Sequence, residues 1–426
     1  AALILEQTDD FNPELAAKDF VNSDKQVSDT DEALSGAMDI IAEIISDNAD
    51  YRKRIRMQTC KSGVLYVKAA KEEDSVYRMY YDYSEPVSSI ANHRLLAVNR
   101  GEKEGFLSVK LECDEDEILG YLKKEIVKNP SSPAAKYIEN AVEDSYKRLI
   151  APSVENETRN LLTDRAQESA IKVFSKNLTG LLLQPPIKGK TVLGLDPGYR
   201  TGCKVAVVDE TGKVLDTNVV YCTLPHHDVN KAKHILKDMI ERNNVDLISI
   251  GNGTATGETQ KVVSELIKEL DKKVYYMVVS EAGASVYSAS KLATEEFPEY
   301  DVALRSAVSI ARRLQDPLAE LVKIDPKAIG VGQYQHDMNQ KRLGEALGGV
   351  VEDCVNNVGV DLNTASPSLL SYVSGVNSSI AKNITLYREE NGKFKNRKQL
   401  LKVPKLGAKA FEQCAGFLKI TDGDNI

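Results

Sequence analysis

The chain has 426 residues, of which 42% are hydrophobic and 28% are charged, as in ordinary globular proteins. Its longest apolar runs, such as 178–183, fall far short of the ~20 residues of a membrane-spanning helix, which argues against a membrane protein. The formal net charge is −8, which taken alone argues against binding to nucleic acid. The length predicts roughly two to four domains.

The first half of the chain is predicted to be mainly helical. Residues 1–60 include "DEALSGAMDIIAEIISDNADYRKRIR", where apolar residues recur at helical spacing behind an acidic cap. Residues 64–115 are mixed, with a strand expected at "GFLSVKLEC". Residues 134–183 are predicted to be helical again, up to "LLLQPPIKGK", where two prolines and a glycine mark a domain boundary.

The next region changes from helical to strand periodicity. We expect strands at "TVLGLD", "KVAVVD", "VLDTNVVY", "VDLISIGNG" and "KVYYMVVS", and helices at "NKAKHILKDMIERNN" and "ETQKVVSELIKELDKK". Three strands followed by helix, strand, helix and strand is the order of an RNase H-like mixed sheet, whereas a doubly wound sheet would alternate strand and helix from its start. From residue 302 onward helices are expected to predominate.

Positive charge is concentrated near the end of the chain. Residues 369–419 contain ten Lys or Arg against three acids, a net charge of +7. Because the whole chain carries −8, the remainder carries −15. The sequence thus predicts a small basic module on an acidic body.

This basic module contains an internal repeat with an offset of thirty residues. Leu370, Val373, Val376 and Ile384 correspond to Leu400, Val403, Leu406 and Cys414. Asn377 corresponds to Gly407, and both residue types tolerate a positive φ, so we expect each to be the left-handed residue of a hairpin. The pattern predicts tandem helix-hairpin-helix motifs, with a helical packing module as the alternative.

Helix-hairpin-helix motifs present backbone N–H groups at the start of their second helix, where a phosphate is favoured. Small residues let a nucleic-acid backbone approach closely, and lysines add charge. The predicted nucleic-acid-binding residues are Gly375, Asn377, Ser378, Lys382, Lys393, Lys395, Arg397, Lys398, Lys405, Gly407 and Lys409. Contacts to phosphates predict binding that is salt-sensitive and tolerant of sequence.

Four carboxylates are candidates for a nuclease site, because RNase H-like nucleases cluster several acids around two divalent ions. They are Asp196, Glu258, Glu281 and Asp316. Three have simpler interpretations: Asp196 precedes a proline in a turn, Glu258 lies in the first turn of a predicted helix, and Asp316 could cap a helix. Mg²⁺ or Mn²⁺ is expected only if the protein is a nuclease; otherwise no cofactor is predicted.

Other motifs argue against further chemistry. "GNGTATGET" follows a strand and opens a helix but lacks the lysine of a Walker loop, so we expect at most anion binding there. The six cysteines are dispersed without a CxxC pair, which predicts free thiols in a reducing cytoplasm and no zinc site. The adjacent His226 and His227 are interpreted as a solvated loop pair.

Long stretches of the chain resemble the bacterial Tex family of transcription accessory factors. They include "LGLDPGYRTGCKVAVVD", "IGNGTATGETQ", "SEAGASVYSAS", "SIARRLQDPLAELVKIDPKAIGVGQYQHDMNQ" and "LLKVPKLGAKAFEQCAGFLKI". "DYSEP", "HRLLAVNRGEKEG" and "YKRLIAPSVENETR" fit the same family, so the resemblance covers essentially the whole chain. It implies a protein that binds RNA and DNA in support of transcription, with no established catalytic reaction.

The resemblance also implies a domain order. We expect a helical Tex-type region at 1–186 with a small mixed part at about 60–120, a YqgF/RNase H-like domain at 187–322, and a helical region at 323–426 with tandem helix-hairpin-helix at about 362–420. Because the first residue is Ala within an apparent helix, and because family members continue into an OB-fold RNA-binding domain, we expect segments missing at both ends.

One departure from resolvase-like relatives concerns catalysis. They place an essential Asp near the start of the last helix of this domain, where Arg305 stands in "DVALRSAVSIARRLQDPL", with Asp301 and Asp316 as nearby alternatives. A cation at this place would repel divalent metal, and we expect it to be available for an ion pair with Asp196 or Glu281.

Together these observations predict a cytoplasmic, monomeric, mostly α-helical multidomain protein with an α/β RNase H-like domain. The predicted function is sequence-tolerant binding of RNA or DNA by a transcription accessory factor without enzymatic activity. One alternative is a metal-dependent RNase H/resolvase-like nuclease that uses Asp196. The other is a protein-binding scaffold of the transcription machinery, with RNA polymerase or ribosome-associated components as partners.

Overall fold

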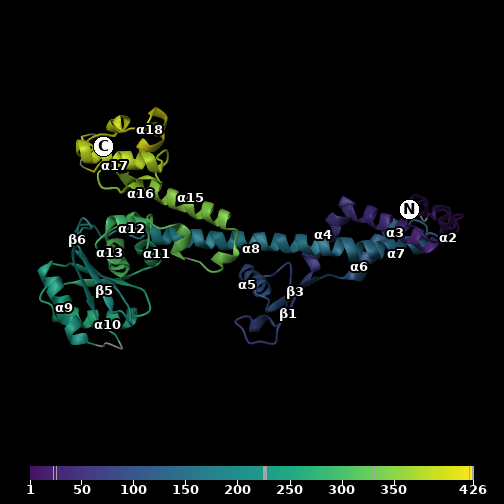
Figure 1. Ribbon diagram of the computed structural model, residues 1–426, viewed down its shortest axis with the longest axis horizontal. Helices are drawn as coiled ribbons and strands as arrows, with labels where there is room; N and C mark the ends of the chain where they lie inside the picture. The colour runs from purple at the N-terminus through teal and green to yellow at the C-terminus, as the bar shows by residue number, and fades with distance from the viewer. Residues whose placement is uncertain (23, 25, 224–227, 331, 422, 425–426) are drawn as a thin grey trace. The chain divides into compact units, whose positions relative to one another are not determined.

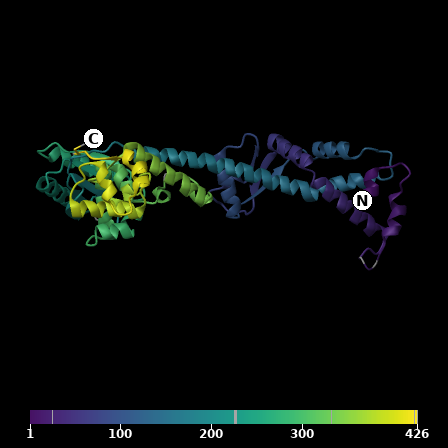
Figure 2. The same cartoon turned by 90° about the horizontal axis from the view of Figure 1, so that it is seen from above.

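The computed structural model describes residues 1–22, 24, 26–223, 228–330, 332–421 and 423–424, so His226 and His227 lie outside the described residues (Figure 1). The chain divides into two compact units, Ala1–Ala170 and Ile171–Ile426, which are described separately. The division falls within helix α8 (Ala151–Leu182), drawn as one continuous ribbon in Figures 1 and 2. Within the described ranges, no helix is long and apolar enough to span a membrane.

The first unit is mainly a helical layer, as the spacing of its apolar residues predicts. Its helices are α1 (Ala2–Glu6), α2 (Pro13–Ala17), η1 (Lys18–Phe20), α3 (Thr30–Ser46), α4 (Ala49–Ser62), α5 (Asn92–Lys103), α6 (Glu115–Ile126), α7 (Ala135–Asp144) and the π-helix η4 (Ser145–Ile150). Asp29, Asn48 and Asp114 accept N–H bonds at the starts of α3, α4 and α6, and so fix where these helices begin. Ile41, Ile55 and Ile118 are among the fully buried side chains between them.

The same unit contains a three-stranded antiparallel sheet with strand order β2-β1-β3. The strands are β1 (Val64–Ala69), β2 (Asp82–Pro86) and β3 (Leu107–Glu112), and η3 (Arg78–Tyr80) precedes β2. The expectation of a strand in "GFLSVKLEC" is therefore confirmed. Strand β3 pairs with β1 on one side only, so its other edge faces outward.

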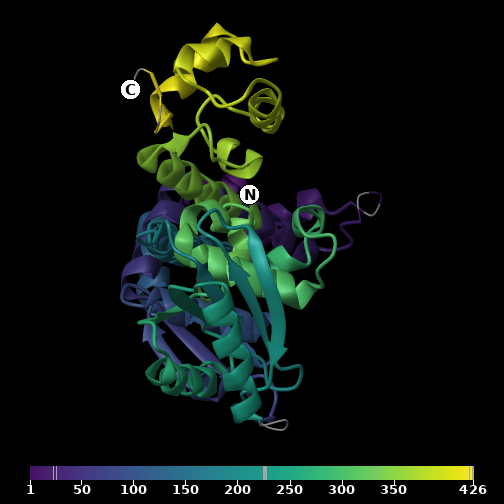
Figure 3. The same ribbon diagram turned by 90° about the vertical axis from the view of Figure 1, so that its left-hand side faces the viewer.

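The second unit contains the mixed sheet that the sequence predicts (Figure 3). Its strands are β4 (Val192–Asp196), β5 (Cys203–Val208), β6 (Val214–Val220), β7 (Leu247–Gly251) and β8 (Tyr275–Val279), in the order β6-β5-β4-β7-β8. The pairs β6/β5 and β5/β4 are antiparallel, and β4/β7 and β7/β8 are parallel. This is the RNase H-like arrangement, so the predicted fold class is confirmed.

Helices cover both faces of this sheet. Helices α9 (Val229–Arg242) and α10 (Thr256–Leu266) bury apolar side chains such as Leu236 and Val263 against one face. Helix α13 (Val302–Gln315) packs on the other face through Ala307, Val308 and Ala311. The surrounding short helices are η5 (Ile267–Glu269), α11 (Ala284–Ser288), α12 (Lys291–Glu296), α14 (Pro317–Leu321), η6 (Pro326–Ile329) and η7 (Gln335–Asp337).

The C-terminal part of the second unit is helical. It consists of α15 (Gln340–Val358), α16 (Pro367–Leu370), α17 (Ser378–Asn391), η8 (Arg397–Lys402), α18 (Ala408–Cys414) and η9 (Ala415–Phe417). A two-residue strand, β9 (Val360–Asp361), pairs in parallel with β10 (Leu418–Lys419) and joins the two ends of this module. The domain boundaries expected at residues 186 and 322 stay predictions.

Candidate functional site

The thirty-residue repeat is present as two hairpins with matching backbone geometry. Gly375 and Lys405 have φ values of +80° and +68°, and the helices α17 and α18 begin three residues after them. The expectation that Asn377 and Gly407 are left-handed was wrong, because both are extended, with φ values of −88° and −83°. They are instead the N-caps of the second helices, a position that Asn and Gly also favour.

The two hairpins pack against each other's second helix. Asn383 of α17 donates its Nδ2 to Pro404 O at 2.7 Å in the second hairpin. In the first hairpin, a Cβ added to Gly375 would lie 2.7 Å from the Cβ of Gln413 in α18. Residues 383 and 413 are thirty positions apart, like 375 and 405, so each unit makes corresponding contacts to the other.

The packing of the second hairpin against α17 places a cation at the start of that helix. The Lys405 Nζ lies 3.0 Å from Ser379 Oγ in the first turn of that helix. Asn377 caps Ile380 N at 2.9 Å, whereas the N–H groups of Ser378 and Ser379 have no acceptor among the residues that the structure describes. Free N–H groups, the helix dipole and an ammonium group therefore coincide at one exposed point, which favours an anion.

Most of the predicted binding residues are available to solvent. Within the described ranges, six lysines are exposed and have no carboxylate at ion-pair distance: Lys382, Lys393, Lys395, Lys398, Lys405 and Lys409. Asn377, Ser378 and Gly407 are also exposed, and Gly375 is half-buried. Arg397 is different, because its Nε donates to Leu418 O at 2.7 Å and so supports strand β10.

The second group of interest is a carboxylate pair beside the mixed sheet. Asp196 ends β4, and Glu281 follows β8, at the edge where these parallel strands end. The negative charge of Asp196 helps to raise the pKa of Glu281, although burial is the larger cause. A Cβ on Gly253 would lie 2.5 Å from Glu281 Oε1, so a side chain at this position would displace the carboxylate from where it lies.

Opposing effects act on the pKa of Asp196. Burial raises the pKa of Asp196, while a hydrogen bond from Ser306 and the positive charge of Lys204 lower it. Lys204 stands opposite Asp196 in the β4/β5 register but donates its Nζ to Gly202 O at 3.1 Å and to Thr201 O. Ser306, in the first turns of α13, is therefore the helix residue that contacts Asp196.

A buried arginine lies next to Glu281. Arg313 of α13 is 4% exposed, and its Nη1 donates to Ser280 O at 2.8 Å and to Ala282 O at 2.7 Å, the two neighbours of Glu281. Its positive charge lowers the pKa of Glu281. The guanidinium thus holds the backbone on both sides of this carboxylate.

The expectation for Arg305 was wrong. Its Nε donates to Phe297 O at 3.0 Å and its Nη1 to Thr294 Oγ1 at 2.9 Å. Among the described residues it forms no ion pair with Asp196 or Glu281. Arg305 therefore holds the segment around α12 to α13, and the cation beside the carboxylates comes from Arg313, eight residues later.

The other two predicted carboxylates have separate partners. Glu258 accepts a bond from Tyr199 Oη at 3.0 Å on an exposed surface. Asp316 caps α14 by accepting from Ala319 N at 3.0 Å and lies 3.6 Å from Lys188 Nζ. No group of three or more His, Cys, Asp or Glu able to hold a metal occurs in the described part of the chain. Two carboxylates beside a guanidinium do not fit the several acids that a pair of divalent ions requires.

Family models match most of the chain. The Tex central region-like model matches residues 8–174, the Tex protein YqgF-like domain residues 190–315, and the helix-hairpin-helix motif residues 355–419. The chain belongs to the Tex family.

Individual Tex relatives align with nearly all of it. "Uncharacterized protein YdcI" of Bacillus subtilis is 53% identical over 99% of this chain and 59% of its own length. "Transcriptional accessory protein Tex" of Neisseria gonorrhoeae is 47% identical over 99% of this chain and 56% of its own length. "S1 RNA-binding domain-containing protein 1" of Homo sapiens is 40% identical over 96% of this chain and 43% of its own length. The chain spans only about half the length of these relatives.

Reasoning from the sequence of this Tex chain missed two residues of the carboxylate site, Ser306 and Arg313. Both lie on α13, and their side of the helix follows only from how it packs on the sheet. The position of Lys204 could have been predicted, because the short hairpin between β4 and β5 places it opposite Asp196.

Proposed function

We propose that this Tex-family chain binds nucleic acid through the phosphate backbone, at the two hairpins of its helix-hairpin-helix module. The observation that carries the proposal is the position of Lys405, whose ammonium group lies 3.0 Å from Ser379 Oγ, in the helix turn where the N–H groups of Ser378 and Ser379 have no acceptor among the described residues. The exposed lysines around the module extend this positive surface. Because these groups recognise phosphate rather than base edges, binding should tolerate different sequences.

The test is charge reversal at Lys405 and Lys409, with RNA and DNA strands of unrelated sequence. We expect Lys405→Glu/Lys409→Glu to weaken binding to every strand to a similar extent. The slope of log Kd against log salt should fall by about 1 to 2, since each lost phosphate contact removes about 0.7 to 0.9 from it.

A matched control is Lys261→Glu/Lys268→Glu, which makes the same charge change on exposed lysines of α10 and of η5, which follows it. If this control weakens binding as much as the hairpin variant, the effect is one of net charge and the proposed interface is wrong. Loss confined to one sequence would contradict recognition through phosphates.

We further propose that the RNase H-like domain is catalytically inactive. The proposal is supported by the position of Arg313 beside Glu281 and by the other partners of Glu258 and Asp316. The test is cleavage of branched and single-stranded substrates in Mg²⁺ or Mn²⁺. Metal-dependent cleavage that disappears in Asp196→Asn would establish the nuclease alternative instead.

A protein partner is a separate proposal. The residues outside 369–419 carry a net charge of −15, which suits a basic surface of RNA polymerase or of a ribosome-associated component. Capture of purified polymerase or ribosomes by residues 1–426, retained in Lys405→Glu/Lys409→Glu and lost at high salt, would support it. Capture lost together with nucleic-acid binding would show that nucleic acid bridges the two.

A further inference from the structure

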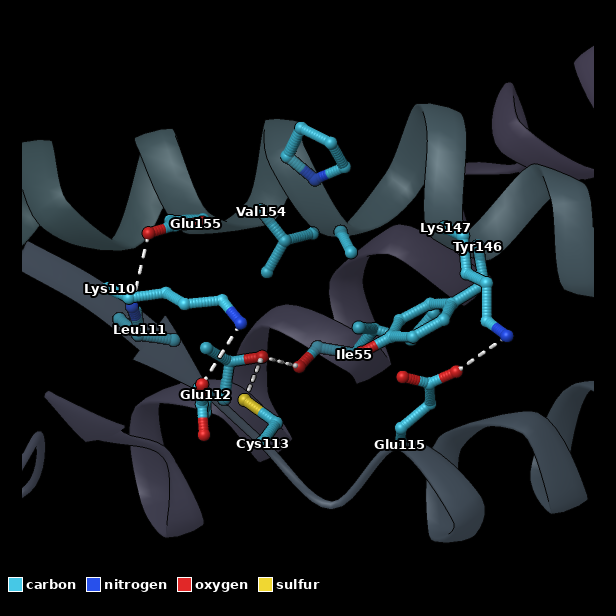
Figure 4. Close-up of a pocket in the computed structure, with 13 residues that line it drawn as sticks. Ile55, Lys110, Leu111, Glu112, Cys113, Glu115, Tyr146, Lys147, Val154 and Glu155 are labelled. Carbon is cyan, nitrogen blue, oxygen red and sulfur yellow. Dashed lines mark hydrogen bonds and ion pairs between the residues drawn. The ribbon is translucent and has the colours of Figure 1, made fainter. Parts of the chain in front are cut away.

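A pocket of about 470 Å³ lies in the first unit, away from the residues discussed so far (Figure 4). Strand β3 and the start of α6 form one side, and η4 and the first turns of α8 form the other. Ile55 and Val154 contribute apolar walls to its middle, whereas charged and polar side chains lie towards both ends. Its size falls within the range of small-molecule sites.

The wall made by η4 is a π-helix with an identifiable cause. Pro152 has no N–H, so the carbonyl of residue 148 cannot receive the usual helical bond. The N–H of Ala151 instead bonds Tyr146 O, five residues earlier. The wider turn contributes Tyr146 and Lys147 to the pocket lining, and π-turns of this kind frequently occur at functional sites.

The hydroxyl group of the largely buried Tyr146 lacks a protein partner among the described residues. The side chain is only 7% exposed, yet in the described part of the chain its Oη has no hydrogen-bond partner. It points towards the middle of the pocket in Figure 4. Burial raises the pKa of Tyr146 to about 12, so the hydroxyl remains protonated at neutral pH. A hydroxyl in this position takes its hydrogen-bond partner from the pocket, either water or a bound molecule.

The opposite end offers unpaired acceptors. Glu155 accepts Leu111 N at 3.1 Å through Oε1, which leaves Oε2 available. The Leu111 carbonyl also faces outward, because β3 pairs with β1 through the residues on either side of it.

The charges around the pocket leave Glu155 unbalanced. Lys110 and Lys147 lie 3.0 and 3.1 Å from Glu112 and Glu115, respectively. Glu155 has no basic partner within ion-pair distance among the residues described, although Lys110 attracts it at longer range, and the lining carries one excess negative charge.

We propose that this pocket binds a small organic cation, an ammonium or guanidinium group on an aliphatic stem. The cationic group bonds Glu155 Oε2 and the Leu111 carbonyl, and the stem packs against Ile55 and Val154. A second polar group at the far end of the ligand bonds the Tyr146 hydroxyl. A nitrogen-based cation fits because acceptors outnumber free donors at the Glu155 end, and because methylene groups suit the apolar middle.

Cys113 lines the pocket and provides the readout, while Cys60 of α4 is equally half-buried but outside the lining. The experiment measures the rate at which iodoacetamide labels each cysteine of the intact chain at a pH of about 8.5. The ligands are agmatine and 1,4-diaminobutane, with 1,4-butanediol as the neutral analogue. At ten times Kd, labelling of Cys113 should slow about tenfold, because only the empty pocket reacts. Labelling of Cys60 should not change.

Two variants distinguish binding in this pocket from a general effect of the ligands on cysteine labelling. Glu155→Gln keeps an acceptor for Leu111 N but removes the charge, and Tyr146→Phe removes only the hydroxyl. Each should weaken protection of Cys113 about tenfold or more, while circular dichroism and Tm verify that the variant is folded. The proposal is overturned if millimolar agmatine and diaminobutane give no protection, if butanediol protects equally, or if both folded variants protect as the parent does.

Discussion

Gly375 and Gln413 approach so closely that a Cβ at position 375 would lie 2.7 Å from the Cβ of Gln413. The φ of Gly375 is +80°, which also disfavours any residue with a side chain. The first hairpin of the repeat therefore depends on glycine for two separate reasons.

We expect Gly375→Ala to lower the free energy of unfolding of the second unit by about 2 kcal/mol, the sum of left-handed strain and steric overlap. The measurement is urea denaturation followed by circular dichroism. Gly407→Ala is the matched control in the other hairpin, because its φ is −83° and no atom lies within 4 Å of the added Cβ. Equal destabilisation by both substitutions would contradict the packing described for Gly375.

Removal of the Arg313 guanidinium should be costly. Arg313→Met leaves the carbonyls of Ser280 and Ala282 unpaired and removes the cation that attracts Glu320 and Glu281, so we expect a loss of about 3 kcal/mol in unfolding free energy. Glu281→Gln in the same background should recover part of this loss, because it removes the uncompensated charge. No recovery in the double variant would show that Arg313 does not stabilise the fold by balancing the charge of Glu281.

The carboxylate pair should make stability depend on pH in an unusual direction. Burial raises the pKa of both Asp196 and Glu281 in the folded chain. The folded state then binds more protons than the unfolded state between the ordinary pKa values, 3.8 and 4.5, and the raised ones. Within that window, the contribution of these two groups to stability falls as pH rises, and above it the penalty is constant.

Asp196→Asn isolates this effect, because an amide oxygen can still accept from Ser306. Relative to the parent, the variant should gain stability as pH increases from about 4 towards neutrality, by about 1.4 kcal/mol for each unit of raised pKa that is removed. Urea denaturation at a series of pH values measures the difference. A difference that is independent of pH would mean that Asp196 has its ordinary pKa.

Two buried tyrosines should respond differently to loss of the hydroxyl. Tyr146 has no partner for its hydroxyl among the described residues, so Tyr146→Phe should change the unfolding free energy by less than about 0.5 kcal/mol. Tyr287 donates its hydroxyl to Glu296, so Tyr287→Phe should cost about 1 to 3 kcal/mol. Thermal and urea unfolding of the two variants give the comparison, and similar losses would show that Tyr146 has a structural partner.

The sheet and the repeat could be predicted because their signals are local. Runs of β-branched residues separated by helical stretches determine the strand order, and a fixed offset of thirty residues reveals the two hairpins. The left-handed positions could not be assigned correctly, because Asn and Gly are favoured both at positive φ and at helix N-caps. A glycine at position 375 indicates a positive φ, but the corresponding residue in the second hairpin is Lys405, a residue type that seldom adopts one.

The arginine beside the carboxylate pair could not be predicted from the sequence of α13 alone. Arg305 and Arg313 both lie on α13, and the comparison with resolvase-like relatives points to Arg305. Which arginine faces Glu281 depends on how α13 lies across the sheet, and this follows from long-range packing through Ala307 and Ala311 rather than from local spacing.

The reciprocal contacts of the two hairpins have a consequence for how this module can vary. Asn383 reaches the second hairpin, and Gln413 lies against the first, so each half completes the other. A longer connection near Gly392 would leave both contacts intact, since it lies outside them. One residue inserted between Gly375 and Asn383 would shift the contacts of both halves at once. The tandem pair should therefore be inherited and lost as a single element, never as one hairpin alone.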